Sequence, residues 1–175
     1  MKAKDIALIG VFSALSFALM FLEIPLIPAV NFLKYDPSEV AALILALNTS
    51  ALHGVLVIIV KDVLFYFAKS GDIIGITMNA IAGIVFVWLV VKFWEKKVLS
   101  ALASIGGTSA LMTALNAVAF PIYFTVMKFG SAGQGLDFFL KVWWAVLLFN
   151  AIKFSIDFVL ALLLNERVEK IFRLG

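Results

Sequence analysis

Long apolar runs follow one another along almost the whole chain, with only short polar segments between them. They cover residues 5–22, 38–52, 54–69, 73–93, 101–127 and 138–164. A helix needs about 20 apolar residues to cross the hydrocarbon core of a bilayer. The composition, 64% hydrophobic and 14% charged, also lies far from that of a water-soluble protein, which is about half apolar and a quarter charged. We therefore predict one all-α domain over residues 1–175, an integral membrane bundle of six transmembrane helices.

Two connections between these runs carry residues that break helices. Residues 48–54 contain Asn, Thr, Ser, His and Gly, so the second and third runs are predicted to be two short helices rather than one. Residues 23–35 contain Pro25 and Pro28 and are too irregular to face lipid. We expect this second segment to fold back over the bundle as a lid.

The basic residues predict the orientation of the bundle. Six spans place both termini on one side, where eight Lys and Arg residues fall against four on the opposite side, with Lys61 and Lys153 inside spans. Basic residues concentrate in cytoplasmic loops. We therefore expect a multi-pass protein of the cytoplasmic membrane with both termini in the cytoplasm.

Several kinds of chemistry are excluded by residues and motifs that the sequence lacks. It contains no Cys and a single His, His53, so thiolate catalysis and a His-based metal site are excluded. It has no G-x-x-x-x-G-K-[ST] loop for ATP, no H-E-x-x-H and no G-x-S-x-G. Arg occurs only at positions 167 and 173, so no guanidinium is available inside the bundle for a phosphate. We expect no enzyme, no metal and no cofactor, and an uncharged ligand.

A few polar side chains fall inside the apolar runs. Asn79, Asn116 and Asn150 lie at similar depth in three different runs, and Lys153 follows Asn150 on the same helix face. A single Asn in this setting usually links two helices. Three amides beside a lysine instead favour a shared cavity for a flat, partly apolar molecule with a hydrogen-bonding edge. Lys153 has an alternative role as the ion-pair partner of Asp157, one helical turn further on.

Lys61 and Asp62 form a second group of charged residues within a predicted span. Adjacent residues point in different directions on a helix, so we expect neither to neutralise the other well. Glu39, at the start of the second run, is the predicted partner of Lys61. A structural ion pair is favoured here over a contact with substrate.

Small residues recur at every fourth position of the first run, at Gly10, Ala14 and Ala18. A ridge of this kind lets another helix approach closely. The residues alone leave open whether that helix belongs to this chain or to a partner protein.

Motifs spread over nearly the whole chain resemble one family of membrane proteins. They are Lys34-Tyr35-Asp36-Pro37-Ser38-Glu39, Val60-Lys61-Asp62, Met78-Asn79-Ala80, Asn116 and Asn150-Ala151-Ile152-Lys153. Together they resemble the riboflavin-specific S component of energy-coupling factor (ECF) vitamin transporters. The resemblance implies a six-helix protein of a bacterial membrane that captures riboflavin outside the cell. It further implies delivery together with a transmembrane coupling subunit and two cytoplasmic ATPase subunits.

The resemblance also implies roles for individual residues. The contacts to the flavin ring would be made by Asn116, Asn150 and Lys153. Asn79, Asp36 and Tyr35 would lie nearby, toward the ribityl chain. The coupling subunit would contact the ridge of Gly10, Ala14 and Ala18. Two residues depart from the family pattern, because the ridge is usually all alanine and Asp62 stands where related sequences tend to have Asn.

Other functions remain open from the sequence. An S component could carry another vitamin, such as thiamine or biotin. A membrane flavoprotein would keep its flavin for electron transfer. A stand-alone proton-coupled carrier would use Asp62, Lys61 or Asp157 as a relay.

Overall fold

The protein is described by a computed structural model that covers residues 1–174, with Gly175 outside the described residues. Also outside are the side chains of residues 29, 70 and 171–174, which include Arg173, one of the basic residues that predict the orientation.

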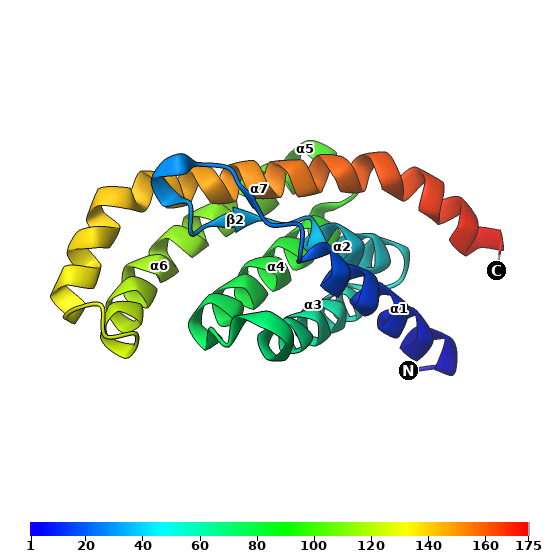
Figure 1. Cartoon of the computed structure of the whole chain (residues 1–175). Helices are drawn as coiled ribbons and strands as arrows, with labels where there is room; N and C mark the ends of the chain where they lie inside the picture. Colours follow the sequence, from blue (N-terminus) through cyan, green and yellow to red (C-terminus); the bar gives the residue numbers. More distant parts are fainter. Residues whose placement is uncertain (175) are drawn as a thin grey trace.

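The described chain is a bundle of six helical segments (Figure 1). In chain order they are α1 (Ala3–Leu19), α2 (Ser38–Asn48), α3 (Ala51–Phe65) with the π-helical turn η2 (Tyr66–Ser70), α4 (Ile73–Phe93), α5 (Lys97–Ala101) continued by the π-helical turn η3 (Leu102–Gly106) and α6 (Gly107–Val126), and α7 (Ala132–Leu174). Both termini lie at one end of the bundle and the connection between α6 and α7 lies at the other. This arrangement agrees with the predicted all-α bundle of six helices.

Several helix ends lie where the sequence predicts them. α4 has the predicted bounds, and Asp72 caps it by accepting hydrogen bonds from the backbone N–H groups of Ile74 and Gly75, at 3.1 and 3.0 Å. α2 and α3 are separate helices as expected, and Ser50 caps α3 by accepting from the N–H of His53. Side-chain oxygens at these positions satisfy backbone donors that have no partner within the helix.

The last two helical segments are longer than predicted. The fifth begins at Lys97 rather than residue 101, and the sixth spans Ala132–Leu174 rather than residues 138–164. The prediction ended the sixth segment at residue 164, where polar and charged residues begin. Lys, Glu and Arg are good helix formers, so this helix continues beyond the apolar run.

Four of the helical segments described within residues 1–174 are long and apolar enough to cross a membrane. They are Ala51–Lys69, Ile73–Phe93, Lys97–Val126 and Ala132–Lys170. α1 has 17 residues and α2 only 11. Every residue of α2 from Ser38 to Ala46 is buried, so α2 is an interior helix surrounded by its neighbours.

Residues 23–37, which we call the strap, connect α1 to α2 and fold back over the bundle as predicted (Figure 1). Within the strap, β1 (Ile24–Pro25) pairs antiparallel with β2 (Lys34–Tyr35), and a 3-10 turn, η1 (Pro28–Val30), lies between them. The strap side chains Ile27, Val30 and Tyr35 pack in one apolar cluster with Ala145 and Phe149 of α7. Burial of these apolar side chains holds the strap on α7, although its β strands and its 3-10 turn are only two or three residues long.

Candidate functional site

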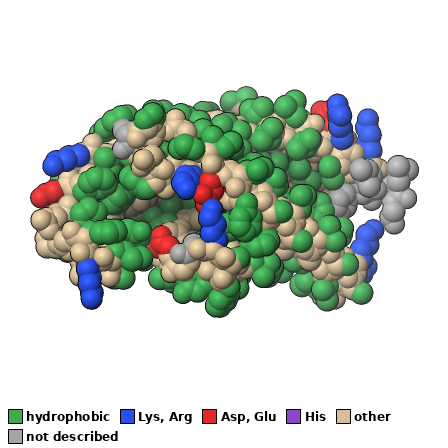
Figure 2. Space-filling view, viewed as in Figure 1, with side chains coloured by type: hydrophobic (Ala, Val, Ile, Leu, Met, Phe, Trp, Pro, Cys, Tyr) green, Lys and Arg blue, Asp and Glu red, His purple; other side chains and the backbone are tan. Residues whose placement is uncertain are grey.

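A cavity of about 580 Å³ lies between the strap and helices α4, α6 and α7. Figure 2 shows a hollow in one face of the molecule, bordered by side chains of both charges within a largely apolar surface. Pockets for small molecules have volumes of about 300–1,000 Å³ and are mostly apolar with a few polar groups. The cavity has the size and character of such a site.

The four polar residues that the sequence singled out converge on this cavity. Asn79 of α4, Asn116 of α6, and Asn150 and Lys153 of α7 all line it. The amide of Asn116 donates to the backbone carbonyl of Met112 at 2.7 Å, and that of Asn150 to the carbonyl of Val146 at 2.8 Å. A primary amide has two N–H donors and one carbonyl oxygen, so each retains a donor and an acceptor.

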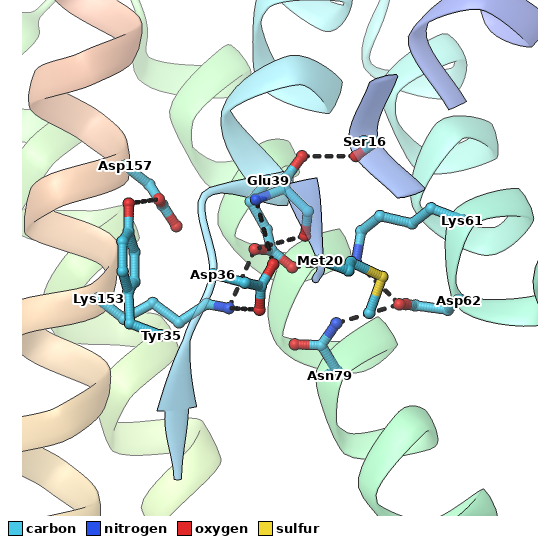
Figure 3. Close-up of polar contacts among 11 residues, drawn as sticks. Ser16, Met20, Tyr35, Asp36, Glu39, Lys61, Asp62, Asn79, Lys153 and Asp157 are labelled. Atoms are coloured by element: carbon cyan, nitrogen blue, oxygen red, sulfur yellow. Dashed lines mark hydrogen bonds and ion pairs between the residues drawn. The ribbon is translucent and has the colours of Figure 1, made fainter. Parts of the chain in front are cut away.

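Lys153 is buried and held by two carboxylates. Its Nζ lies 3.2 Å from Oδ2 of Asp36 and 3.0 Å from Oε2 of Glu39 (Figure 3). Asp157, the alternative partner that the sequence offered, accepts a hydrogen bond from the hydroxyl of Tyr35 at 3.0 Å instead. Since an ammonium group has three N–H donors, Lys153 keeps one that neither carboxylate uses.

The expected contacts of Tyr35 and Asp36 with a ligand stay a prediction. Both are buried, 6% and 8% exposed, and their polar groups contact α7. The strap residues that line the cavity are the three that precede them, Phe32, Leu33 and Lys34.

A chain of buried charges continues from Lys153 into the bundle. Glu39 also contacts Lys61, with Nζ at 3.3 Å from Oε1, which confirms the predicted pair. The expectation that Lys61 and Asp62 could not neutralise each other was wrong, because the long lysine side chain bends to bring Nζ within 2.8 Å of Asp62 Oδ1. Asp62 also accepts a hydrogen bond from the amide of Asn79 at 3.1 Å.

Aromatic rings form much of the cavity wall. Phe32 of the strap makes edge contact with Phe120 of α6, with centroids 5.9 Å apart, and Phe120 lies 5.5 Å from Phe138 of α7. Phe154 also lines the cavity, and behind it the ring stacks on the buried Phe86 at 4.6 Å. Such rings favour contact with a flat apolar or aromatic ligand.

Sequence reasoning missed these aromatic residues and the link between Glu39 and Lys153. The chain contains 17 Phe, so no single one stands out by type or spacing. The contact of Glu39 with Lys153 could have been suspected from the sequence. Glu39 is an acid at the start of an apolar helix, and such acids usually pair with basic residues inside the bundle.

Glu23 of the strap links Lys34, which lines the cavity, to Lys69 of η2. Its carboxylate contacts Lys34 Nζ at 2.8 Å and Lys69 Nζ at 2.7 Å. Hydrogen bonds from these two ammonium groups hold the pKa of Glu23 below its usual value of 4.5. We call this group of three residues the Glu23 clamp.

The ridge of small residues lies on the outer face of α1. Gly10, Ala14 and Ala18 are exposed, whereas Ile9, Ser13 and Ser16 of the same helix are buried. A Cβ atom added to Gly10 would meet nothing within 4 Å. The ridge is therefore free for a helix from outside this chain.

The family model for the ECF transporter, substrate-specific component, matches residues 4–165. The chain belongs to this family. It is therefore an S component, a membrane protein of a transporter family rather than an enzyme, as the sequence motifs predicted.

Several curated relatives of this S component are named riboflavin transporters. RibU of Streptococcus thermophilus is 33% identical over 172 residues, 91% of this chain and 81% of the relative. FmnP of Bacillus subtilis is 35% identical over 128 residues, 67% of each chain. RibU of Leuconostoc mesenteroides is 31% identical over 191 aligned positions, 98% of this chain and 94% of the relative.

The fold is similar to that of a solved S component of a bacterial ECF transporter. The TM-score is 0.79 and the comparison covers 98% of each chain at 22% sequence identity. This similarity confirms the predicted S-component fold.

Proposed function

We propose that this S component binds riboflavin from the extracellular side of a bacterial cytoplasmic membrane and delivers it inward. The observation that carries the proposal is the cavity itself, in which Asn116, Asn150 and Lys153 present hydrogen-bonding groups between aromatic walls. The names of the relatives in Streptococcus thermophilus and Bacillus subtilis support riboflavin as the ligand.

The chemistry of the flavin ring matches the proposed contacts. One edge of the isoalloxazine ring carries an imide N–H between two carbonyl oxygens, and the opposite end is an apolar dimethylbenzene. The free donor and acceptor of Asn116 and Asn150 can pair with the imide edge in both directions. The remaining N–H of Lys153 would donate to a ring carbonyl or ring nitrogen. Asn79 would contact the ligand from the α4 side of the cavity.

Delivery requires partners, because the sequence contains no ATP-binding loop. In the proposed complex, a transmembrane coupling subunit packs on the ridge of Gly10, Ala14 and Ala18, and two cytoplasmic ATPase subunits supply the energy. The exposure of the ridge supports this arrangement. The termini, at one end of the bundle, would lie in the cytoplasm.

The proposal is tested by purifying the full chain in detergent, identifying any small molecule released on denaturation, and titrating the ligand-free protein with riboflavin. We expect a yellow preparation that releases unmodified riboflavin and rebinds it reversibly without redox activity. Binding of thiamine or biotin in place of riboflavin would contradict the proposal. Uptake driven by a pH gradient into vesicles that contain this chain alone would instead favour a proton-coupled carrier.

A further inference from the structure

An unbroken series of polar contacts runs through the protein interior between two cavity-lining residues (Figure 3). It begins at Lys153 on α7, passes through Glu39 of α2 and then Lys61 and Asp62 of α3, and ends at Asn79 on α4. The successive contacts measure 3.0, 3.3, 2.8 and 3.1 Å. Glu39 and Lys61 are 0% exposed and Asp62 is 2% exposed. We call these five residues the ionic chain.

The three interior members of the ionic chain lie beside an apolar core that the same helices already share. α2, α3 and α4 already share an apolar cluster that includes Leu43, Val57 and Phe86. Burying ion pairs among apolar helices usually stabilises a fold no more than apolar side chains of the same volume would. A buried ionic series that reaches a cavity at both ends therefore points to a role at the cavity.

The ionic chain determines which groups the cavity presents. Glu39 and Asp36 occupy two of the three N–H donors of Lys153, which leaves the third in a fixed direction. Asp62, paired with Lys61, is a carboxylate that only accepts hydrogen bonds, so the NH₂ group of Asn79 must face it. The carbonyl oxygen of Asn79 then remains free to accept.

Helix α4 keeps Glu39 in place through a close approach at Gly83. A Cβ atom added to Gly83 would lie 3.3 Å from both Cγ and Oε1 of Glu39. A methyl group at this position would press on the Glu39 side chain and, at the same distance, on Cδ1 of Ile58, so these neighbours would have to shift by a few tenths of an ångström. The position of the carboxylate is therefore fixed by packing as well as by its two lysines.

We propose that Glu39 is a positioning residue for substrate binding, which acts on the ligand through Lys153, while Asp62 at the other end of the ionic chain sets the orientation of Asn79. The proposal rests on the proposed function, in which Lys153 donates to the flavin ring. Glu39 contacts Lys153 but is not among the described residues that line the cavity, so in the proposed complex it acts on the ligand only through Lys153.

A double-mutant cycle on riboflavin affinity tests this role. The dissociation constant is measured for the wild type, Glu39→Gln, Lys153→Met and the double variant, since Glu39→Gln keeps the shape and removes the charge. We expect Glu39→Gln to raise the dissociation constant at least about tenfold in the wild type but less than about threefold when residue 153 is Met. An unchanged constant in Glu39→Gln, or equal factors in the two backgrounds, would overturn the proposal.

The absorption spectrum of the bound flavin separates positioning from a loss of stability. Glu39→Gln should shift the spectrum of the flavin that remains bound in the same direction as Lys153→Met does. A variant that only loosens the fold would lower the melting temperature and leave this spectrum as in the wild type, which would count against the proposal.

If Glu39→Gln does not fold, Gly83→Ala replaces it in the same cycle, with the same criteria. Gly106→Ala is the matched control, because a Cβ atom at Gly106 would meet nothing within 4 Å. The wild-type titration separates the two proposals. No riboflavin binding by the wild type would reject both, whereas tight wild-type binding with equal factors in the cycle would reject only the role of Glu39.

Discussion

Asn116 of α6 and Asn150 of α7 line the same cavity, and the amide of each donates a hydrogen bond to the backbone carbonyl four residues earlier in its own helix. These internal bonds fix the two side chains before any ligand arrives. The free donor and acceptor of each amide are therefore preorganised, so little conformational entropy is lost on binding.

The first prediction concerns these two amides. Asn116→Ala and Asn150→Ala should each raise the dissociation constant for riboflavin about tenfold to a hundredfold. The reason is that an imide group left without its partner in a buried site costs about 1–3 kcal/mol. Quenching of riboflavin fluorescence on titration measures the constant.

Asn48→Ala is the matched control for these variants. The Asn48 amide also donates to the carbonyl four residues earlier, that of Ile44 at 2.9 Å, but it lies in the part of α2 away from the cavity and contacts Asn165. Its removal should leave riboflavin affinity unchanged. An equal loss in all three variants would mean that the amides act on helix stability rather than on the ligand.

The second prediction concerns the charge of the ligand. Both lysines that line the cavity are already paired, Lys153 with Asp36 and Glu39, and Lys34 with Glu23. A phosphate group carries a charge of about −1.5 to −2 at neutral pH and would find no unpaired cation among these two.

Riboflavin should therefore bind more tightly than riboflavin 5′-phosphate, by about tenfold or more, in competition titrations at neutral pH. Glu23→Gln should reduce the difference in affinity between the two flavins, because Lys34 is no longer paired with the carboxylate of Glu23. Equal affinity of the wild type for both molecules would show that the cavity does not discriminate by charge.

The sequence predicted the parts of this protein that depend on hydrophobic periodicity and on unusual polar residues. The bounds of α4 and the break between α2 and α3 follow from apolar runs and capping residues. The convergence of Asn79, Asn116 and Asn150 followed from their similar depth in different spans.

Apart from the pair of Lys61 with Glu39, the partners of individual charges could not be predicted in the same way. A lysine side chain is long and flexible, so its Nζ reaches groups on several sides, and Lys61 contacts both its neighbour Asp62 and the distant Glu39. Lys153 likewise contacts Asp36 and Glu39 rather than the residue one turn further along its helix. Which carboxylate each lysine contacts depends on how the helices pack against one another, and the spacing of residues along one helix does not predict that packing.

The third prediction concerns the ridge on α1. Ala14→Leu should leave riboflavin affinity within about twofold of the wild type, because Ala14 is exposed and lies on the face of α1 opposite the buried Ser13 and Ser16. The same change should prevent co-purification with the coupling and ATPase subunits, since a bulky side chain keeps two helices apart at a small-residue ridge.

Ala110→Leu, at an exposed position of α6, is the control for added bulk on the surface and should still assemble. Loss of riboflavin binding in Ala14→Leu would place the ridge in the internal packing of this chain. Normal assembly of Ala14→Leu would place the coupling contact elsewhere.

The fourth prediction concerns the Glu23 clamp. Glu23→Gln should speed the dissociation of riboflavin about twofold to tenfold at neutral pH. It removes one ion pair within the strap, to Lys34, and one that holds the strap to Lys69 of η2, and exposed pairs contribute about 0.2–1 kcal/mol each. Stopped-flow recovery of flavin fluorescence measures the rate. Asp137→Asn, a change at an exposed acid of α7, is the control and should leave the rate unchanged.

The pH dependence of this effect has a definite sign. Because the two lysines lower the pKa of Glu23, the clamp is fully formed above the ordinary value of 4.5 and is lost as the pH falls through the lowered pKa. The ratio of the dissociation rates of Glu23→Gln and wild type should therefore be constant above pH 4.5 and approach one at lower pH. The ratio cancels the titration of other acids, which both proteins share. A ratio that stays constant down to the lowest pH at which the protein remains folded would show that protonation of Glu23 does not release the strap.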